Sequence, residues 1–497
     1  MLNSILEKKK MEKKMKKSIV KNYIYNLTYQ ILVLILPLIT TPYLSRVLGA
    51  EGIGIYSYTI SIVTYFILFG SLGMAIYAQR EIAYVQNDKE KRSKVFFETF
   101  IIRFITLMIS MLVFYISFAS QGEYSTYYKI LILEIVANIF DISAFFQGIE
   151  EFKKTIKRNL IVKVISIISI FIFVKTADDV NKYLCIYVIS TLIGNLSLWL
   201  YLPQYITKIS MRSLELKKHL KPAIALFVPQ IATQIYTVLD KTMIGSLIID
   251  KAEVGYYEQS QKIVKMILTI VTSLGTVMLP RIANKFANGK IEEIKKNILT
   301  SFNFVYFLSI PMMFGLIAIS KELIPWFLGN NFEKSVCILY VISPIIILIG
   351  LSNVIGTQYL LPTKRQKQYT ISVIMGAITN LIFNFVFIPK LLSVGAAIGT
   401  VIAETVVTGI QFYYIRKEYN IFKVLKMSIK YFASAIIMLV LIMLVNKFIL
   451  NTSEVLLRMG LDICVGMVIY CVSLIAFKDS FFLSVINKTL KLKRNDT

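Results

Sequence analysis

The stretch that decides the fold is VLDKTMIGSLIIDKAEVGYYEQSQKIVKM, residues 238–266. It has the apolar background of two membrane-spanning helices, yet these helices carry five ionisable side chains, namely Asp240, Lys241, Glu258, Lys262 and Lys265. A single charge at the centre of a membrane helix costs about 2.5–3.5 kcal/mol on insertion scales, so such groups face protein or water rather than lipid. We therefore expect them to line a polar cavity through which something charged is carried.

The composition is that of a polytopic membrane protein. The chain has 497 residues, of which 56% are hydrophobic, and a mean hydropathy of +0.67, well beyond the range of soluble globular proteins. Its formal net charge of +26 does not indicate a nucleic-acid partner, because the basic residues form short clusters between apolar runs. The apolar run that starts at Ile19 is too long for a cleaved secretory signal, so we expect it to remain as the first membrane helix.

Apolar segments of membrane-spanning length recur along the whole chain. About fourteen of them approach the roughly 20 residues that are needed to cross the hydrocarbon core. We place them near 20–43, 54–77, 95–118, 128–149, 159–175, 183–203, 222–245, 255–279, 297–320, 335–361, 369–389, 394–414, 427–449 and 456–477. The predicted fold is an all-α polytopic membrane protein with two pseudo-symmetric lobes of about six helices each and two further C-terminal helices. The corresponding segments are a basic tail (1–21), a first lobe (22–203), a linker (204–221), a second lobe (222–414), a helix pair (415–477) and a C-terminal tail (478–497).

The charge of the connections predicts the orientation in the membrane. Lys and Arg concentrate in alternate connections, which places both termini in the cytoplasm by the positive-inside rule. The external connections are short, and the longest one, 321–334, is near the upper end of ordinary loop lengths. A folded external catalytic domain has no room there, so we do not expect an enzyme.

Cysteine and histidine usage argues against a metal site. The four cysteines all fall within apolar segments, where they are expected to be small buried hydrophobes, at Cys185, Cys337, Cys464 and Cys471. The only histidine, His219, lies in a basic loop and is expected to be solvated. We therefore expect no metal, no cofactor and no histidine-based catalysis.

An internal repeat relates the two halves of the chain. Arg80-Glu81-Ile82-Ala83 matches Arg281-Ile282-Ala283, and the turn over 50–56 matches the turn over 252–257. Both pairs are offset by about 200 residues, which fits two parallel repeats related by an axis along the membrane normal.

Polar residues recur at helical spacing on three of the expected spans. The three sets are Gln230, Gln234, Thr237 and Lys241; Glu258, Gln261, Lys262 and Lys265; and Glu134, Asn138 and Asp141. An alternative to ligand binding is that Asp240–Lys241 and Glu258–Lys262 are ion pairs that hold two helices together. Lys265 has no carboxylate on its adjacent turns and is expected near the midplane, so it is the stronger candidate for ligand contact.

Further charged and polar groups lie on other expected spans. Arg46 and Arg80 would continue a basic track, although Arg80 also fits a cytoplasmic anchor. Glu404 would be a proton or sodium site, and Arg458 and Asp462 would form an i, i+4 ion pair. Asn380 and Asn384 have the spacing of interhelical hydrogen-bonding groups.

Four motifs resemble one known family. They are Thr41-Pro-Tyr-Leu-Ser-Arg-Val-Leu-Gly-Ala-Glu-Gly-Ile-Gly54, Phe145-Phe-Gln-Gly-Ile-Glu150 with the following segment 153–159, Tyr236-Thr-Val-Leu-Asp-Lys-Thr-Met-Ile-Gly245, and Met278-Leu-Pro-Arg-Ile-Ala283. Together they resemble the Wzx-type flippases of the multidrug/oligosaccharidyl-lipid/polysaccharide (MOP) superfamily, which export O-antigen and capsule repeat units.

The resemblance implies two six-helix lobes facing each other and a central cationic cavity for an undecaprenyl-diphosphate-linked oligosaccharide. It also implies a bacterial cytoplasmic membrane location, contact with membrane lipid, and other polysaccharide-assembly membrane proteins as partners. The expected substrate path combines the resemblance with the polar faces and comprises Arg46, Arg80, Asp141, Gln147, Glu150, Gln234, Asp240, Lys241, Glu258, Gln261, Lys262 and Lys265. Asp240 and Glu404 are the expected sites of Na⁺ or H⁺ coupling.

Three other functions are weighed against this one. A cation-coupled multidrug antiporter of the related MATE group has twelve helices and a carboxylate-centred site, which the buried lysines argue against. A glycan polymerase or lipid-dependent glycosyltransferase needs a large external loop or an acidic metal motif, which the sequence lacks. A flippase for peptidoglycan precursors shares the architecture and stays open.

Overall fold

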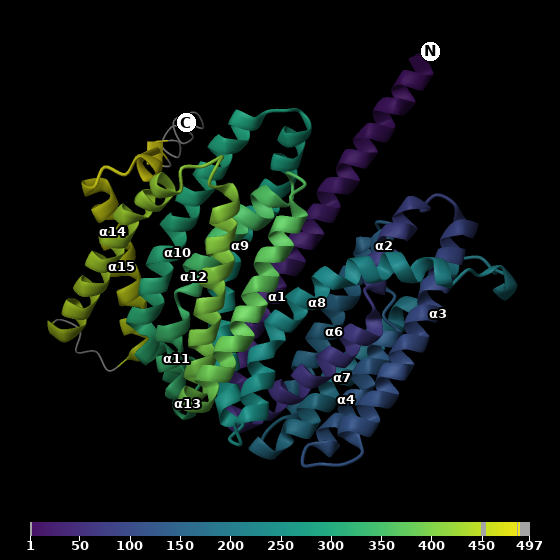
Figure 1. Cartoon of the computed structure of the whole chain (residues 1–497), viewed down its shortest axis with the longest axis horizontal. Coiled ribbons are helices and arrows are strands. Elements are labelled where there is room, and N and C mark those ends of the chain that lie inside the picture. The colour runs from purple at the N-terminus through teal and green to yellow at the C-terminus, as the bar shows by residue number, and fades with distance from the viewer. Residues whose placement is uncertain (1, 449–453, 485, 488–497) are drawn as a thin grey trace. The chain divides into compact units, whose positions relative to one another are not determined.

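The computed structural model describes residues 2–448, 454–484 and 486–487, and in these ranges all regular elements are helices (Figure 1). Ten of the described helices are long and apolar enough to cross a membrane. This confirms the prediction of an all-α polytopic membrane protein, whereas the total of about fourteen spans stays a prediction. Residue 1 of the predicted basic tail, and residues 485 and 488–497 of the predicted C-terminal tail, lie outside the described residues.

The chain divides into two compact units, Met1–Val238 and Leu239–Thr497, here called the first and the second unit. The boundary lies inside helix α8, Lys217–Leu247. The helices of the first unit are α1 Leu2–Ser71, α2 Met74–Tyr84, α3 Lys89–Phe114, α4 Ser125–Ile139, α5 Ser143–Gly148, α6 Phe152–Phe173, α7 Val180–Trp199 and the first part of α8. Those of the second unit are the rest of α8, α9 Ala252–Ala287, α10 Ile291–Phe327, α11 Lys334–Ile342, α12 Ile345–Ser352, α13 Gln366–Ile415, α14 Ile421–Phe448 and α15 Val455–Ala476.

Two helices are interrupted by sharp kinks where the sequence predicts a boundary between spans. In α1 the backbone departs from helical geometry at Gly49, with φ of 67°, a conformation that glycine adopts without strain. In α13 the departure lies at Leu392, with φ of 56°. Close by, a Cβ at Gly395 would come within 2.3 Å of the Phe387 carbonyl oxygen, so this kink requires glycine. The predicted spans 369–389 and 394–414 therefore fall on one kinked helix. The span 20–43 lies on α1, while 54–77 runs past the end of α1 at Ser71 into α2.

The core of the first unit forms where α2, α3 and α5 meet the end of α7. Apolar side chains from these helices exclude solvent there, and they are Ala78, Ile82, Phe96, Ile142, Phe145, Phe146, Leu198 and Leu202. In the same unit α4 and α6 both pack against α7, while α1 contacts α3 and α4. These contacts leave α1, α4, α6 and α7 around a common polar space, described below.

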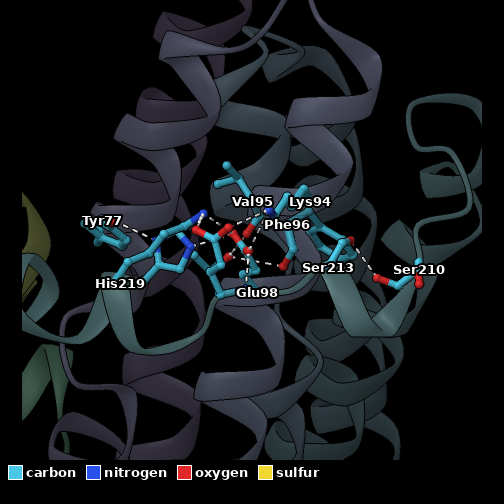
Figure 2. A network of polar contacts seen from close by, with 11 residues as sticks. Tyr77, Lys94, Val95, Phe96, Glu98, Ser210, Ser213 and His219 are labelled. Carbon is cyan, nitrogen blue, oxygen red and sulfur yellow. Dashed lines mark hydrogen bonds and ion pairs between the residues drawn. The ribbon is translucent and has the colours of Figure 1, made fainter.

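His219, in the first turn of α8, ties the start of this helix to the rest of the first unit (Figure 2). Its side chain is buried, with Nδ1 at 2.7 Å from the Tyr77 hydroxyl and Nε2 at 2.7 Å from a Glu98 carboxylate oxygen. The other partners of Glu98 include the backbone N–H of Glu215 at 2.7 Å and Lys218 at 3.3 Å. The prediction of a solvated histidine is therefore wrong, because this basic loop folds back onto the buried end of Glu98.

The same segment is held at two further points outside the membrane helices. Glu215 forms ion pairs with Lys218 at 3.1 Å and with Lys94 at 3.2 Å, and these hydrogen bonds hold the pKa of the Glu215 carboxyl below its usual value. Upstream, the Arg92 guanidinium donates to the Tyr205 carbonyl oxygen. Several residues of the predicted linker 204–221 are thus hydrogen-bonded or ion-paired to residues at the start of α3.

In the second unit, α14 and α15 pack against each other and against α10 (Figure 1). Arg458 of α15 lies 3.5 Å from Glu322 of α10, and Asn446 of α14 donates to Asp462 at 3.0 Å. The predicted i, i+4 pair between Arg458 and Asp462 is therefore wrong, because each side chain finds a partner on a neighbouring helix instead.

Candidate substrate path

Asp240 is the centre of a buried polar site in the second unit. Its Oδ1 accepts hydrogen bonds from the side-chain amides of Asn380 at 2.9 Å and Asn384 at 2.7 Å, both on α13. Its Oδ2 accepts from the Thr400 hydroxyl at 2.9 Å and from the Tyr257 hydroxyl. Side chains of α8, α9 and α13 therefore converge on one carboxylate, and their donors replace the hydration that a charge loses on burial.

Lys241 does not pair with its neighbour Asp240. Its ammonium lies 3.0 Å from Glu258 of α9, and both side chains are largely buried, at 18% and 12% exposed. The alternative pairing of Asp240 with Lys241 and of Glu258 with Lys262 is therefore wrong in detail. The ion pair that does form, between Lys241 and Glu258, joins α8 to α9. The alternative expected ion pairs to hold two helices together in this way.

A chain of hydrogen bonds leads from Lys265 to Asp240. The Lys265 ammonium donates to the side-chain Oε1 of Gln261 at 2.9 Å, and the side-chain Nε2 of Gln261 donates to the Tyr257 hydroxyl at 3.3 Å. Tyr257 in turn donates to Asp240. Lys265 is solvent-exposed, Lys262 is half-buried and Gln261 is buried, so the chain runs from the accessible face of α9 into the core of the unit.

Two arginines of the predicted path lie in the first unit. Arg46 is exposed in α1. Arg80 lies 2.9 Å from Glu81 of its own helix and 5.4 Å from the centre of the Tyr77 ring, and its side chain is 40% exposed. This environment fits the alternative of a cytoplasmic anchor at least as well as a basic track.

The remaining predicted path residues are dispersed over the first unit. Asp141 accepts a hydrogen bond at 2.9 Å from the backbone N–H of Ser143 and lines a polar cavity. Gln147 is half-buried in α5, and Glu150 is exposed in the connection to α6 with φ of 60°. Gln234 is exposed on α8. The structure thus brings together the residues predicted on α9 and the end of α8, and leaves the roles of the others as predictions.

Sequence reasoning missed that Asp240 has dedicated partners. Asn380 and Asn384 were recognised as a hydrogen-bonding pair, but nothing in their spacing says which helix they face. Glu404 is buried on α13, one turn after Thr400, and the Thr400 hydroxyl donates a hydrogen bond to Asp240. The signal available in the sequence was the presence of polar groups in both apolar segments that form α13, before and after its kink at Leu392.

Buried charges within apolar membrane-spanning helices mark a functional site, and comparisons with known proteins specify the class of protein. The family model of the polysaccharide biosynthesis protein matches residues 19–286, and a second model, MatE, matches residues 225–386. The first match covers more than half of the chain, so the protein belongs to the polysaccharide biosynthesis protein family. The resemblance to Wzx-type flippases of the MOP superfamily is confirmed.

One relative and two solved structures agree with this assignment. A protein of Escherichia coli (strain K12) described as an O-antigen transporter is 24% identical over 389 residues, which are 77% of this chain and 93% of that protein. The lipid II flippase MurJ in an inward closed conformation has a TM-score of 0.76 at 18% identity, over 93% of this chain and 99% of that one. An inward-facing multidrug resistance MATE family transporter of the MOP superfamily has a TM-score of 0.60 at 13% identity, over 78% and 98%. The two structures show the shared fold, and the chain is a transporter rather than an enzyme.

Proposed function

We propose that the protein moves an undecaprenyl-diphosphate-linked oligosaccharide from the inner to the outer leaflet of the bacterial cytoplasmic membrane by alternating access. The observation that carries this proposal is the surplus of lysines on α9. Lys262 and Lys265 lie one turn apart there, while the carboxylate on the same face, Glu258, is already paired with Lys241. Membership of a polysaccharide biosynthesis family supports a glycan-bearing cargo, and both termini are placed in the cytoplasm as part of the same proposal.

A diphosphate headgroup must leave water to cross the membrane, which costs far more free energy than moving a neutral group. Ammonium groups replace part of its hydration with charge-assisted hydrogen bonds. Lys265 suits this role because it is accessible and because, within the described part of the chain, its hydrogen bond goes to the neutral Gln261 rather than to a carboxylate. Uncompensated positive charge is therefore available for the cargo.

The hydrogen-bond chain from Lys265 to Asp240 provides a route for coupling. A phosphate oxygen that takes the ammonium of Lys265 competes with Gln261 for it. Gln261 then loses the donor that orients its amide toward Tyr257, and Tyr257 is the residue that donates to Asp240. Cargo binding on the face of α9 thereby changes how strongly Asp240 is held, as expected for a polarised network.

Asp240 is the proposed site for a coupling ion, either a proton or Na⁺. Hard cations prefer oxygen ligands, and the carboxylate and the Thr400 hydroxyl provide them, while Asn380 and Asn384 present their amide N–H₂ groups to the carboxylate. The Asn384 amide oxygen is buried and has no hydrogen-bond partner, which fits an additional ligand position. Glu404, one turn further along α13, is a second candidate for the same role.

The decisive experiment is deletion of the gene followed by extraction of lipid-linked saccharides. We expect an undecaprenyl-diphosphate oligosaccharide to accumulate on the cytoplasmic face, and expression of the intact gene to clear it. Lys265→Ala should restore about a tenth or less of export at an unchanged protein level. The matched control is Lys290→Ala, because Lys290 is an exposed lysine just beyond the end of the same helix.

Three outcomes would overturn the proposal in different ways. Normal glycan export with increased drug sensitivity would favour a multidrug antiporter. Accumulation of the peptidoglycan precursor alone would favour a precursor flippase. Full export by Lys265→Ala would remove that lysine from the substrate path.

A further inference from the structure

The first unit contains a polar cavity that the lysine cluster of α9 does not explain. It lies among α1, α4, α6 and α7 and has a volume of about 470 Å³. Its charged lining residues balance, with Glu134 and Asp141 against Arg158 and Lys163. A single water occupies about 30 Å³ in the liquid and ligand pockets typically span about 300–1,000 Å³, so this space exceeds what a bare ion requires.

Glu134 is the feature that points to a ligand. It lies on α4, is only 8% exposed and lines the cavity. The Tyr187 hydroxyl is hydrogen-bonded to its carboxyl group, but the second oxygen, Oε2, is buried and has no partner. A buried acceptor without a donor costs about 1–3 kcal/mol, which a hydroxyl group entering the cavity would recover.

The arginine that lines the cavity is held in place by other residues of the same unit. Arg158 of α6 donates to the side-chain Oδ1 of Asn195 and, at 2.8 Å, to the Ser143 hydroxyl. Asn195 donates at 2.7 Å to the Ala137 carbonyl oxygen of α4. The positive charge of Arg158 is therefore already hydrogen-bonded, whereas the Glu134 carboxylate has one oxygen that can still accept a hydrogen bond.

The balanced charges and the open acceptor of Glu134 disfavour a diphosphate, and the volume suits a neutral, hydroxyl-rich group. A carboxylate and amides accept and donate to hydroxyls, and the rings of Tyr183 and Tyr187 supply apolar faces beside them. We propose that this cavity binds sugar residues of the cargo, with Glu134 accepting a hydrogen bond from a sugar hydroxyl. The inference rests on the proposed function and adds to it a separate site for the glycan, distinct from the lysines that take the diphosphate.

The test uses the full-length protein in detergent with two lipid-free probes. One probe is the mixture of oligosaccharides released by mild acid from the cell's lipid-linked saccharides, and the other is inorganic pyrophosphate. The chain has two tryptophans, and Trp199 lies one turn beyond Asn195 on α7, so Trp326→Phe leaves Trp199 as a fluorescence reporter. Pyrophosphate binding is followed by calorimetry.

Glu134→Gln should weaken oligosaccharide binding about tenfold, since a charged acceptor becomes a neutral amide, and should leave pyrophosphate binding unchanged. Lys265→Ala should do the reverse. Glu123→Gln is the matched control, because it makes the same change at an exposed position of the same unit. Ser190→Phe, which fills the cavity from α7, should abolish the oligosaccharide signal while pyrophosphate still binds, and so reports occlusion without touching Glu134.

Oligosaccharide binding that survives both Glu134→Gln and Ser190→Phe would overturn the inference. So would a Glu134→Gln variant that loses affinity for both probes equally, since that result describes general damage. Failure of the proposed function is a separate result: the deletion strain would then accumulate no lipid-linked oligosaccharide, whatever the purified protein binds.

Discussion

The polar sites of the two units differ in which charge is left open. In the second unit Asp240 accepts from four side chains and Glu258 is paired with Lys241, while Lys265 holds only a neutral glutamine among the described residues. In the first unit Arg158 is engaged by Asn195 and Ser143, while Glu134 keeps one oxygen without a partner. One unit has a cationic site and the other an acceptor site.

On the proposed function, this contrast suits a cargo with two chemically different parts. A diphosphate needs positive charge that the protein has not already neutralised. A sugar needs acceptors and donors without a net charge, because a surplus of either sign would raise the cost of the empty site. The surplus of positive charge lies on α9 of the second unit, whereas the charged residues that line the cavity of the first unit balance.

The largest expected difference between the two units concerns removal of their central carboxylates. Asp240→Ala leaves four buried donors without their acceptor and should lower the free energy of unfolding by about 2–4 kcal/mol. Glu134→Ala removes the acceptor of one hydroxyl and also removes a poorly compensated carboxylate, so it should change stability by less than about 1 kcal/mol. Thermal unfolding of both variants in the same detergent checks this, and equal losses would contradict the contrast.

A smaller effect is expected at the tyrosines that hold these carboxylates. Tyr257→Phe removes a hydroxyl that contacts Asp240, Thr400 and Gln261, and should cost about 1–2 kcal/mol. It also cuts the path from Lys265, so export should lose its dependence on the coupling ion while pyrophosphate still binds. Tyr187→Phe, the matched change in the first unit, should leave ion dependence intact; loss of that dependence in Tyr187→Phe would show that coupling does not run through Tyr257 alone.

The pair between Lys241 and Glu258 allows a charge-reversal test. Lys241→Glu and Glu258→Lys should each destabilise by about 1–3 kcal/mol, since each places like charges together in a largely buried position. The double reversal should recover part of the loss, because Glu258→Lys also adds a positive charge one turn from Lys262. The control is the exposed pair in the first unit, where Arg80→Ala should cost less than about 0.5 kcal/mol because of its exposure to solvent. A double reversal as unstable as the singles would indicate that the two residues have other partners.

Much of this molecule could be predicted from its sequence, because charges in apolar helices are informative by themselves. The excess of ionisable groups in 238–266 identified the site of the second unit, and the hydropathy pattern identified the class of fold. Pairing between helices could not be predicted. Asp462 and Arg458 have the spacing of an ion pair, yet each pairs with a different neighbouring helix, and periodicity along one helix carries no information on that choice.

His219 illustrates a second limit. A loop rich in lysine is normally solvated, so the sequence predicts solvent exposure for any residue in it. This expectation fails because of Glu98. Its carboxylate is buried on α3 and requires hydrogen-bond donors, and the segment 215–219 supplies them. The cavity of the first unit was missed for a related reason, since Glu134, Asn138 and Asp141 indicate a polar face but not the empty volume opposite it.

The smallest expected effect is the most specific test of the contrast. Glu134→Gln and Asp240→Asn each exchange a carboxylate oxygen for an amide N–H₂ of similar size. At Asp240 that amide must face Asn380 and Asn384 or Thr400 and Tyr257, all donors, so the exchange should cost about 1–2 kcal/mol. At Glu134 the amide can point into the cavity where Oε2 has no partner, so stability should change by no more than about 0.5 kcal/mol while oligosaccharide binding falls. Melting curves with and without oligosaccharide separate the two effects: if Glu134→Gln melts as early as Asp240→Asn, the carboxylate of the first unit is held as firmly as that of the second and is not open to a ligand.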